Sequence, residues 1–365
     1  MNSIDELVSD VRAGRMVIVM DDEARENEAD LIMAAEAVTP EMVGFFVRHT
    51  SGIICQPMLR ERLEELRLPP MVPENTESHR TAFTISVDYR HGTTTGISAH
   101  DRSKTIRALA DPGSHPEDFA RPGHIFPLRY MEGGVLCRAG HTEATIDLVR
   151  LAGFRTQSGI LCEIVNDDGT MKRGADLTEF ASVNHLKVGT IEDLIRYRLR
   201  TERSVERISD QNVRTEFGEF RMCCYEDHVN RDVHVALVRG KLDGGRPPLV
   251  RVHLTDSLRD LIGIQSDRGR PLRDAMQRIA AEGDGVIVLL RQPETPRDFV
   301  EAVRALGPTR TTPARAEGGQ VLRTYGIGAQ ILQDLGVTRM RVLAAPRQLH
   351  GIAAFNLEIV EYVDS

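Results

Sequence analysis

The feature that most constrains the fold is an acidic stretch at residues 21–30, in which six of ten residues are Asp or Glu. Short apolar runs flank it, at residues 16–20 before it and residues 31–35 after it. Both runs are bounded and partly β-branched, a pattern typical of buried strands. We therefore predict two strands joined by a loop that presents many carboxylate oxygens.

This loop could have either of two roles. Dense carboxylates can bind a hard divalent cation such as Mg²⁺, which takes one or two protein carboxylates and completes its shell with water and substrate oxygens. The alternative is a solvated acidic turn, which is the commoner fate of an arbitrary acidic loop. Other motifs of the chain have to decide between the two.

Length and composition limit the class of protein. At 365 residues the chain is long for one core, so two domains are expected. The net charge of −8 and the lack of a basic run with interleaved aromatic residues argue against nucleic acid as a partner. We also expect no membrane partner and a cytoplasmic location, because the chain has neither a signal-peptide pattern nor the roughly twenty apolar residues of a membrane span. The five cysteines form no CxxC pair, which argues against a disulfide framework and a four-cysteine zinc site.

Strands that alternate with helices indicate a mixed α+β N-terminal domain. Among the predicted elements are helices at residues 4–14, 39–49, 59–66, 98–110 and 142–153, and strands at residues 51–55, 81–87 and 160–165. The charged stretch near residues 198–209 separates the domains, so we assign residues 1–203 to the first and residues 204–365 to the second.

The helix that begins near Thr142 is a candidate anion site. Arg138, Ala139, Gly140 and His141 directly precede it. Its free N–H groups, the Thr142 hydroxyl and the Arg138 guanidinium could hold a phosphate, although an ordinary capped helix is an equal alternative. His141 is available as a metal ligand opposite the acidic loop, but a lone histidine is more often structural.

Three further residues could carry chemistry. Glu163 lies within an apolar strand, where an unpaired buried carboxylate costs several kcal/mol, so it either faces solvent or has a partner in a cleft. His124 follows Arg-Pro-Gly, which presents its ring rigidly, and imidazole suits general acid–base work near neutral pH. Cys55 ends a predicted strand and is more typical of packing than of a nucleophile.

Taken together, six motifs resemble those of the 3,4-dihydroxy-2-butanone 4-phosphate synthase family of riboflavin biosynthesis. They are DDExRENExD at 21–30, RHxSGIxC at 48–55, TTGISA at 94–99, RPGHxFPL at 121–128, GHTEATIDL at 140–148 and LCE at 161–163. They occur in the family's order over essentially residues 1–200, which makes the resemblance far more specific than any one motif.

The resemblance implies a three-layer α/β/α sandwich that acts as a homodimer. The implied reaction converts D-ribulose 5-phosphate, a sugar phosphate, into L-3,4-dihydroxy-2-butanone 4-phosphate and formate with Mg²⁺ or Mn²⁺. Glu26 and His141 would be the metal ligands. Arg25 and Asp30 would contact sugar hydroxyls, and residues 138–142 would hold the phosphate.

The resemblance also implies that His124 and Glu163 are the essential acid–base groups, with Glu163 in contact with the substrate. The proposed chemistry agrees with the residue types, because a Lewis-acidic metal favours enediol formation while these two side chains move protons. Residues in a supporting position would be Asp21, Glu28, Cys55 and Thr95.

The second half resembles GTP cyclohydrolase II at residues 215–220, 250–253 and 325–336. Zinc cysteines of that family should follow His253, yet residues 253–272 contain none, and the aligned positions are Ser257, Ser266 and Arg268. None of these side chains replaces a thiolate on Zn²⁺. We therefore expect an α/β domain without zinc or ring-opening chemistry. A bifunctional enzyme with residual GTP cyclohydrolase II activity and a structural or regulatory binding module are the alternatives.

Overall fold

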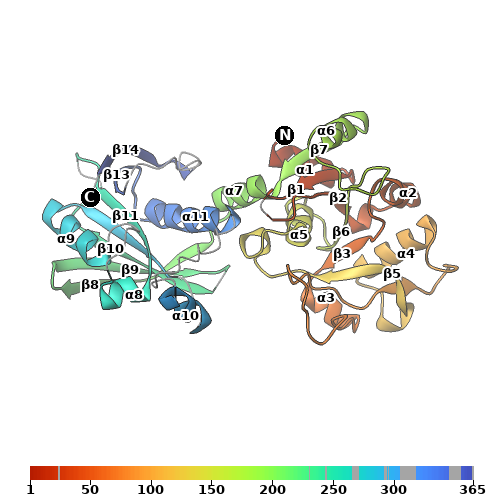
Figure 1. Cartoon of the computed structure of the whole chain (residues 1–365), viewed down its shortest axis with the longest axis horizontal. Helices are drawn as coiled ribbons and strands as arrows, with labels where there is room; N and C mark the ends of the chain where they lie inside the picture. Colours follow the sequence, from red (N-terminus) through yellow and green to blue (C-terminus); the bar gives the residue numbers. More distant parts are fainter. Residues whose placement is uncertain are drawn as a thin grey trace. The chain divides into compact units, whose positions relative to one another are not determined.

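A computed structural model places the chain in two compact units, Met1–Tyr197 and Arg198–Ser365 (Figure 1). The division falls inside helix α7 (Ile191–Thr201), so the domain boundary at residues 203 and 204 stays a prediction. The structure describes residues 1–23, 25–229, 231–242, 245–264, 271–291, 294, 296–304, 318–344 and 355–363.

The first unit is the predicted α/β/α sandwich, built on a seven-stranded sheet of order β4-β5-β3-β6-β2-β1-β7 (Figure 1). Its strands are β1 (Val17–Met20), β2 (Ala29–Ala34), β3 (Cys55–Met58), β4 (Val87–Tyr89), β5 (Phe119–Arg129), β6 (Gly159–Glu163) and β7 (Lys187–Thr190). Its helices are α1 (Ile4–Arg12), α2 (Pro40–His49), α3 (Arg60–Glu65), α4 (Ala99–Ala110), α5 (His141–Leu151) and α6 (Gly174–Val183), with 3₁₀ turns η1 (Ala35–Ala37), η2 (Pro116–Asp118) and η3 (Gly134–Leu136).

The acidic stretch forms the loop of the predicted hairpin. β1 and β2 pair antiparallel, with Val19 opposite Asp30 and Met20 opposite Ala29. Every residue of β2 is buried, because the strand lies inside the sheet between β1 and β6 and both sheet faces are covered. The apolar runs on either side of the acidic stretch therefore fix its two ends in the sheet.

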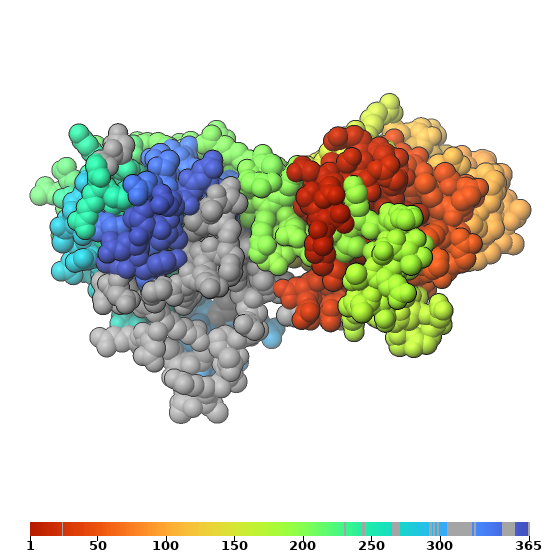
Figure 2. Space-filling model, turned by 90° about the horizontal axis from the view of Figure 1, so that it is seen from above, coloured from red at the N-terminus to blue at the C-terminus, as the bar shows by residue number. Residues whose placement is uncertain are grey.

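Helices cover both faces of this sheet. On one face, side chains of α2, α4 and α6, such as Phe46, Ile106 and Phe180, share a core with Leu31 and Met33 of β2. On the other face α1 and α5 pack against each other and against the central strands. The N-terminal residues lie beside the segment of α6 and β7 (Figure 2), where Asn2 exchanges two hydrogen bonds with the backbone of Val188.

Two predicted strands are displaced. Residues 51–54 only lead into β3, because Gly52 adopts a φ of +87° that breaks the extended conformation. Residues 81–86 form isolated bridges at Phe83 and Thr84 before the short β4 begins. Pro127, which lies opposite this segment on β5, has no N–H to continue the ladder.

The second unit has its own seven-stranded sheet, of order β14-β13-β11-β12-β10-β9-β8, in agreement with the predicted α/β domain. Its elements are β8 (Val205–Thr215), β9 (Gly218–Asp227), β10 (Asp232–Arg239), β11 (Leu249–Leu254), α8 (Ser257–Ile262), α9 (Leu272–Glu282), β12 (Gly285–Leu290), α10 (Pro296–Arg304), α11 (Gly318–Asp334), β13 (Arg339–Leu343) and β14 (Glu358–Val363). One core joins α11 to the sheet through Ile327 and Ile331, and another joins α9 through Ile279. Within the described residues, no helix is long and apolar enough to cross a membrane.

Candidate active site

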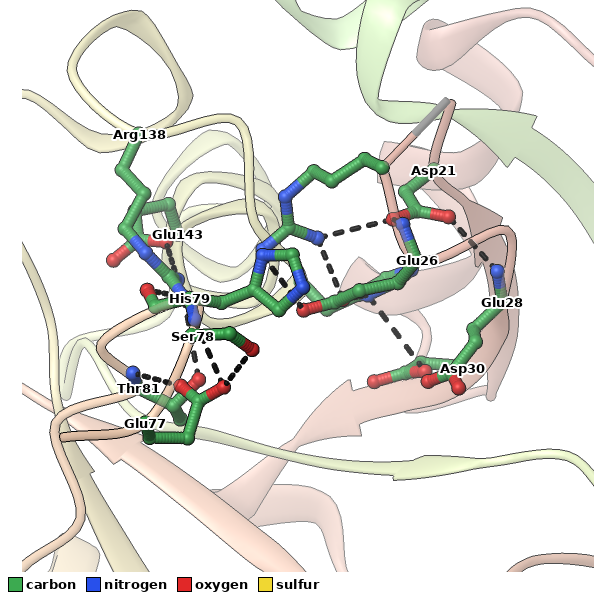
Figure 3. Close-up of polar contacts among 12 residues, drawn as sticks. Asp21, Glu26, Glu28, Asp30, Glu77, Ser78, His79, Thr81, Arg138 and Glu143 are labelled. Atoms are coloured by element: carbon green, nitrogen blue, oxygen red, sulfur yellow. Dashed lines mark hydrogen bonds and ion pairs between the residues drawn. The ribbon is translucent and has the colours of Figure 1, made fainter. Parts of the chain in front are cut away.

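Asp21 organises the acidic loop. One carboxylate oxygen, Oδ1, accepts the backbone N–H of Glu28 at 2.9 Å, and Oδ2 accepts that of Glu26 at 3.0 Å. Oδ2 also accepts Nη1 of Arg25 at 3.0 Å, and the Asp21 side chain is only 1% exposed. The turn at Asn27, with a φ of +54°, completes the reversal. This half of the loop is therefore an ordered, inward-facing structure (Figure 3) and not a solvated turn.

Asp21, Glu26 and His141 form a candidate metal site, since each offers a ligand atom and these atoms lie within 4.8 Å of one another. Nδ1 of His141 lies 3.7 Å from Oε2 of Glu26 and 3.8 Å from Oδ1 of Asp30. Nε2 of His141 and Oδ1 of Asp30 are buried without a hydrogen-bond partner among the described residues. Because buried polar atoms are normally hydrogen-bonded, these two unpaired atoms are available as ligands for a divalent cation.

The pKa shifts in this cluster show how its charges are balanced. Burial, with Glu163, Glu28 and Glu26 adding repulsion, raises the pKa of Asp30 to about 8. Burial disfavours the charged form of His141, but the nearby Asp30 and Glu26 raise its pKa to about 9. For Glu26, burial is likewise outweighed, and His141 and Arg25 lower its pKa to about 2. Protons on Asp30 and His141 thus offset the negative charge, a role that a bound cation can take over.

The segment before α5 forms the candidate anion site. Gly140 is the N-cap of α5, so the first N–H groups of the helix are open, with Thr142 beside them and Ala139 half-buried. Nη1 of Arg138 donates to Oε2 of Glu143 at 2.8 Å. A Cβ on residue 140 would lie 2.4 Å from that Arg138 nitrogen, so any other residue there would displace the Arg138 guanidinium. The predicted residues therefore lie together.

Glu163 and Cys55 lie on neighbouring strands. Glu163 is level with Asp30 across the β2–β6 pair, and its Oε2 accepts the Ser51 hydroxyl at 2.6 Å. Of the two readings of Glu163, the structure therefore favours a carboxylate with a partner. Cys55 is buried, and burial together with the charge of Glu163 raises the pKa of its thiol well above the usual range, which favours the packing interpretation.

His124 is held by a carboxylate that the sequence analysis missed. Nδ1 of His124 lies 2.7 Å from Oδ2 of Asp88, and the His124 backbone N–H donates to Oδ1 of the same residue at 2.9 Å. The His124 side chain remains 40% exposed, so its other ring nitrogen is accessible. Thr95 lies in the adjoining loop, where Gly96 packs so closely on Asp88 that a Cβ there would be 2.0 Å from Oδ2. Asp101 holds this loop through the backbone N–H groups of Thr94 and Gly96.

The sheet register relates His124 to Glu163. Cys55 on β3 is level with Phe126 on the parallel strand β5 and with Leu161 on the antiparallel strand β6. His124 lies two residues before Phe126 on β5, and Glu163 lies two residues after Leu161 on β6. Because β5 and β6 run in opposite directions, both steps lead the same way along the sheet. His124 and Glu163 therefore lie level with each other on either side of β3. Two strand spacings separate them by about 10 Å. No hydrogen bond or ion pair joins them among the described residues.

Besides Asp88, sequence reasoning missed His79, which lies between the helix predicted at residues 59–66 and the strand predicted at residues 81–87. Nδ1 of His79 is 3.9 Å from Oε1 of Glu26. The only signal for Asp88 was its place after an alternating segment, and no periodic pattern marked His79.

The site combines a buried carboxylate–histidine cluster with an open helix N-terminus. On a mixed α/β fold, this combination is typical of enzymes that act on small anionic substrates. The family model for 3,4-dihydroxy-2-butanone 4-phosphate synthase matches residues 5–197, and that for GTP cyclohydrolase II matches residues 206–364. A Pseudomonas aeruginosa protein named 3,4-dihydroxy-2-butanone 4-phosphate synthase is 49% identical over 364 residues, covering 100% of this chain and 99% of its own.

Two solved structures are also similar. A two-domain 3,4-dihydroxy-2-butanone 4-phosphate synthase from A. baumannii has a TM-score of 0.83 at 41% identity, covering 100% of this chain and 99% of its own. A synthase described as a complex with two magnesium ions has a TM-score of 0.54 at 48% identity, covering 55% of this chain and 99% of its own. The chain belongs to the 3,4-dihydroxy-2-butanone 4-phosphate synthase family of riboflavin biosynthesis, which confirms the predicted family and enzyme class.

We predict that Gly123→Ala destabilises the first unit. A Cβ on residue 123 would lie 2.0 Å from the carbonyl carbon of Val87, and this backbone cannot rotate away. By the cost of overpacking, the free energy of unfolding should fall by about 1–3 kcal/mol or more, measured by urea denaturation. Gly44→Ala is the control, because a Cβ on that helical glycine meets nothing within 4 Å. Equal stability of Gly123→Ala and the wild type would contradict the described contact between β4 and β5.

Proposed function

We propose that the first domain converts D-ribulose 5-phosphate into L-3,4-dihydroxy-2-butanone 4-phosphate and formate. The observation that carries the proposal is the position of His141, which belongs to the metal cluster and is also the first residue of α5. A cation site for sugar oxygens thus adjoins an anion site for a phosphate. A phosphorylated ketose has these two groups at opposite ends of a short chain.

Glu26 and His141 are the proposed ligands of Mg²⁺ or Mn²⁺, and Asp21 lies within reach of the same ion. When bound, the cation supplies Lewis acidity at the ketose oxygens. Oxygen ligands favour these hard cations, and the magnesium complex of the similar synthase supports the assignment. Glu28 lies on the same loop, where burial and the charge of Glu163 raise its pKa.

The substrate is held from both ends in this proposal. Residues 138–142 bind the phosphate through Arg138 and the open N–H groups of His141 and Thr142, while Arg25 and Asp30 contact the sugar hydroxyls. Arg25 also donates to Oε2 of Glu26 at 2.6 Å, so it fixes the carboxylate that faces the cation. Asp30, with its raised pKa, can donate a proton in a hydrogen bond to a hydroxyl.

His124 and Glu163 are the proposed acid–base groups. Asp88 occupies Nδ1 of His124, which leaves Nε2 to take a proton from the carbon next to the ketone. The Asp88 carboxylate stabilises the imidazolium that results. Glu163 lies level with His124 across β3, so a sugar bound over this part of the sheet can exchange protons with both. We further expect the enzyme to act as a homodimer.

We propose that the second domain is non-catalytic and holds no zinc. Nε2 of His253 lies 3.0 Å from Oδ2 of Asp260, and the Ser257 hydroxyl donates to Glu294 at 2.6 Å, so both side chains are engaged within the domain. Ser266 and Arg268 fall outside the described residues. Cys223 and Cys224 are neighbours on β9, so their side chains point to opposite faces and cannot share one ion.

Formate release from ribulose 5-phosphate should require Mg²⁺ or Mn²⁺ and stop when EDTA removes it. Glu26→Gln and His141→Ala should each lower kcat/KM by at least about 100-fold, because each removes a ligand of the cation. Glu23→Gln is the matched control, since that acid lies on the same loop but is exposed. Full activity in either ligand variant would sink the metal assignment.

His124→Gln should lower kcat by about 100- to 10,000-fold without loss of folded structure, because the proton acceptor is removed. His91→Gln is a close control: His91 also lies 2.9 Å from an aspartate, Asp118, but on the surface. Steady-state formate assays and circular dichroism measure the two effects. Substantial residual kcat in His124→Gln would demote the residue to substrate positioning.

Purified protein should contain no stoichiometric zinc and release no formate from GTP, because the second domain lacks thiolate ligands after His253. Elemental analysis and a GTP turnover assay test this expectation. Bound zinc with GTP-dependent formate release would instead favour the bifunctional alternative. Saturable nucleotide binding without turnover would identify a regulatory binding module.

A further inference from the structure

The segment Glu77–Thr81 touches both ends of the proposed substrate site. Nη2 of Arg138 donates to the His79 carbonyl at 3.1 Å and to the Thr81 hydroxyl at 3.3 Å. Nδ1 of His79 lies 3.9 Å from Oε1 of Glu26. Figure 3 shows the segment and the acidic loop as one line of polar contacts between Arg138 and Asp21.

Glu77 holds this segment in a closed turn. Its carboxylate accepts the backbone N–H groups of His79 and Thr81, each at 2.8 Å, and the Ser78 hydroxyl at 2.8 Å. These hydrogen bonds, led by the one from the His79 backbone, lower the pKa of Glu77 to about 2. Asn75 closes the base of the turn, because its Nδ2 donates to the Thr81 carbonyl at 2.9 Å and its Oδ1 accepts the Glu77 N–H at 3.0 Å.

Packing alone does not hold the segment in place. Glu77 and Thr81 also line a cavity of about 850 Å³, together with Met71, Val72 and Phe83. Because open space lies beside part of the segment, the hydrogen bonds to Glu77 contribute to its position.

Each of the two side chains that the segment touches is held from two sides. Oε2 of Glu26 faces Arg25 at 2.6 Å and His141 at 3.7 Å, while Oε1 faces His79. Nη1 of Arg138 is occupied by Glu143, while Nη2 is bonded to the segment. The segment thus bonds one proposed phosphate ligand, Arg138, and lies within ion-pair distance of one proposed metal ligand, Glu26.

We propose that Glu77–Thr81 is a positioning segment that couples the cation end of the site to the phosphate end. His79 acts on the cation end through Oε1 of Glu26. The His79 carbonyl and the Thr81 hydroxyl act on the phosphate end through Arg138, and Glu77 fixes both. This inference rests on the proposed function, because the cation end and the phosphate end are defined by it. The segment itself makes no contact with the reacting atoms.

Two substitutions separate the two ends. His79→Asn keeps the backbone carbonyl but is too short to reach Glu26, so Mn²⁺ affinity should fall about tenfold, as for partners that orient a metal ligand. KM for ribulose 5-phosphate at saturating Mn²⁺ should stay unchanged. Thr81→Val removes only the hydroxyl, so KM should rise several-fold with unchanged Mn²⁺ affinity, and Thr81→Ser should restore KM.

Mn²⁺ affinity is measured by electron paramagnetic resonance on the full chain without substrate, and KM by formate release. Glu77→Ala should lower Mn²⁺ affinity and raise KM together. Loss of a structural contact unrelated to the site would lower stability but would not change these two quantities in this way. His185→Asn is the control, because His185 is an exposed histidine at a φ of +54° that asparagine also adopts. Circular dichroism confirms that each variant is folded.

The outcomes distinguish the two proposals. A wild-type protein that releases no formate overturns the proposed function, and the Mn²⁺ titration of His79→Asn still decides the cation end of the coupling. An active wild type with unchanged Mn²⁺ affinity in His79→Asn and unchanged KM in Thr81→Val overturns the positioning role. If Glu77→Ala does not fold, these two single variants decide alone.

Discussion

The buried carboxylate of Asp21 is the interaction on which the site depends. It bonds two backbone N–H groups and Arg25 at once, and so converts a highly charged loop into one defined conformation. Without that anchor, mutual repulsion among the acids would favour an extended, solvated loop. With it, Glu26 faces His141 instead of water. Apart from Asp30, the hairpin strands are apolar, and Asp21 closes the loop between them.

The two ends of the site are joined by chain connectivity as well as by contacts. His141 begins α5, and Arg138 lies three residues earlier, so a shift of this helix would move both ends together. Buried Asp147 limits such a shift, because it accepts the Val135 N–H at 2.9 Å and the Tyr130 hydroxyl at 3.2 Å. In the proposed site, one rigid helix would therefore set the spacing between cation and phosphate, as positioning of a short substrate requires.

Sequence patterns were sufficient for the hairpin, for α5 and for the residues that bracket them, because these features are local: apolar runs, a cap and a motif. Asp88 and His79 were missed because their partners lie 36 and 53 residues away, a separation that no periodicity encodes. The displaced strand at residues 81–87 has a related cause. Alternation in residues 81–87 was visible, but the loss of a ladder donor at Pro127 belongs to another strand. Contacts between residues far apart in the sequence thus decide where a strand begins and which side chains pair, and the local pattern does not show them.

We propose that the second domain has kept the fold of its family without the chemistry. Its cores use alternating apolar residues of the sheet, such as Val286 and Ile287, against Ile331 of α11 on one face and Ile279 of α9 on the other. None of these side chains could bind zinc, so the cores impose no requirement for thiolates after His253. His253 pairs with Asp260 within the domain. Stability and chemistry reside in different residues, and a domain that kept the first while losing the second is physically consistent.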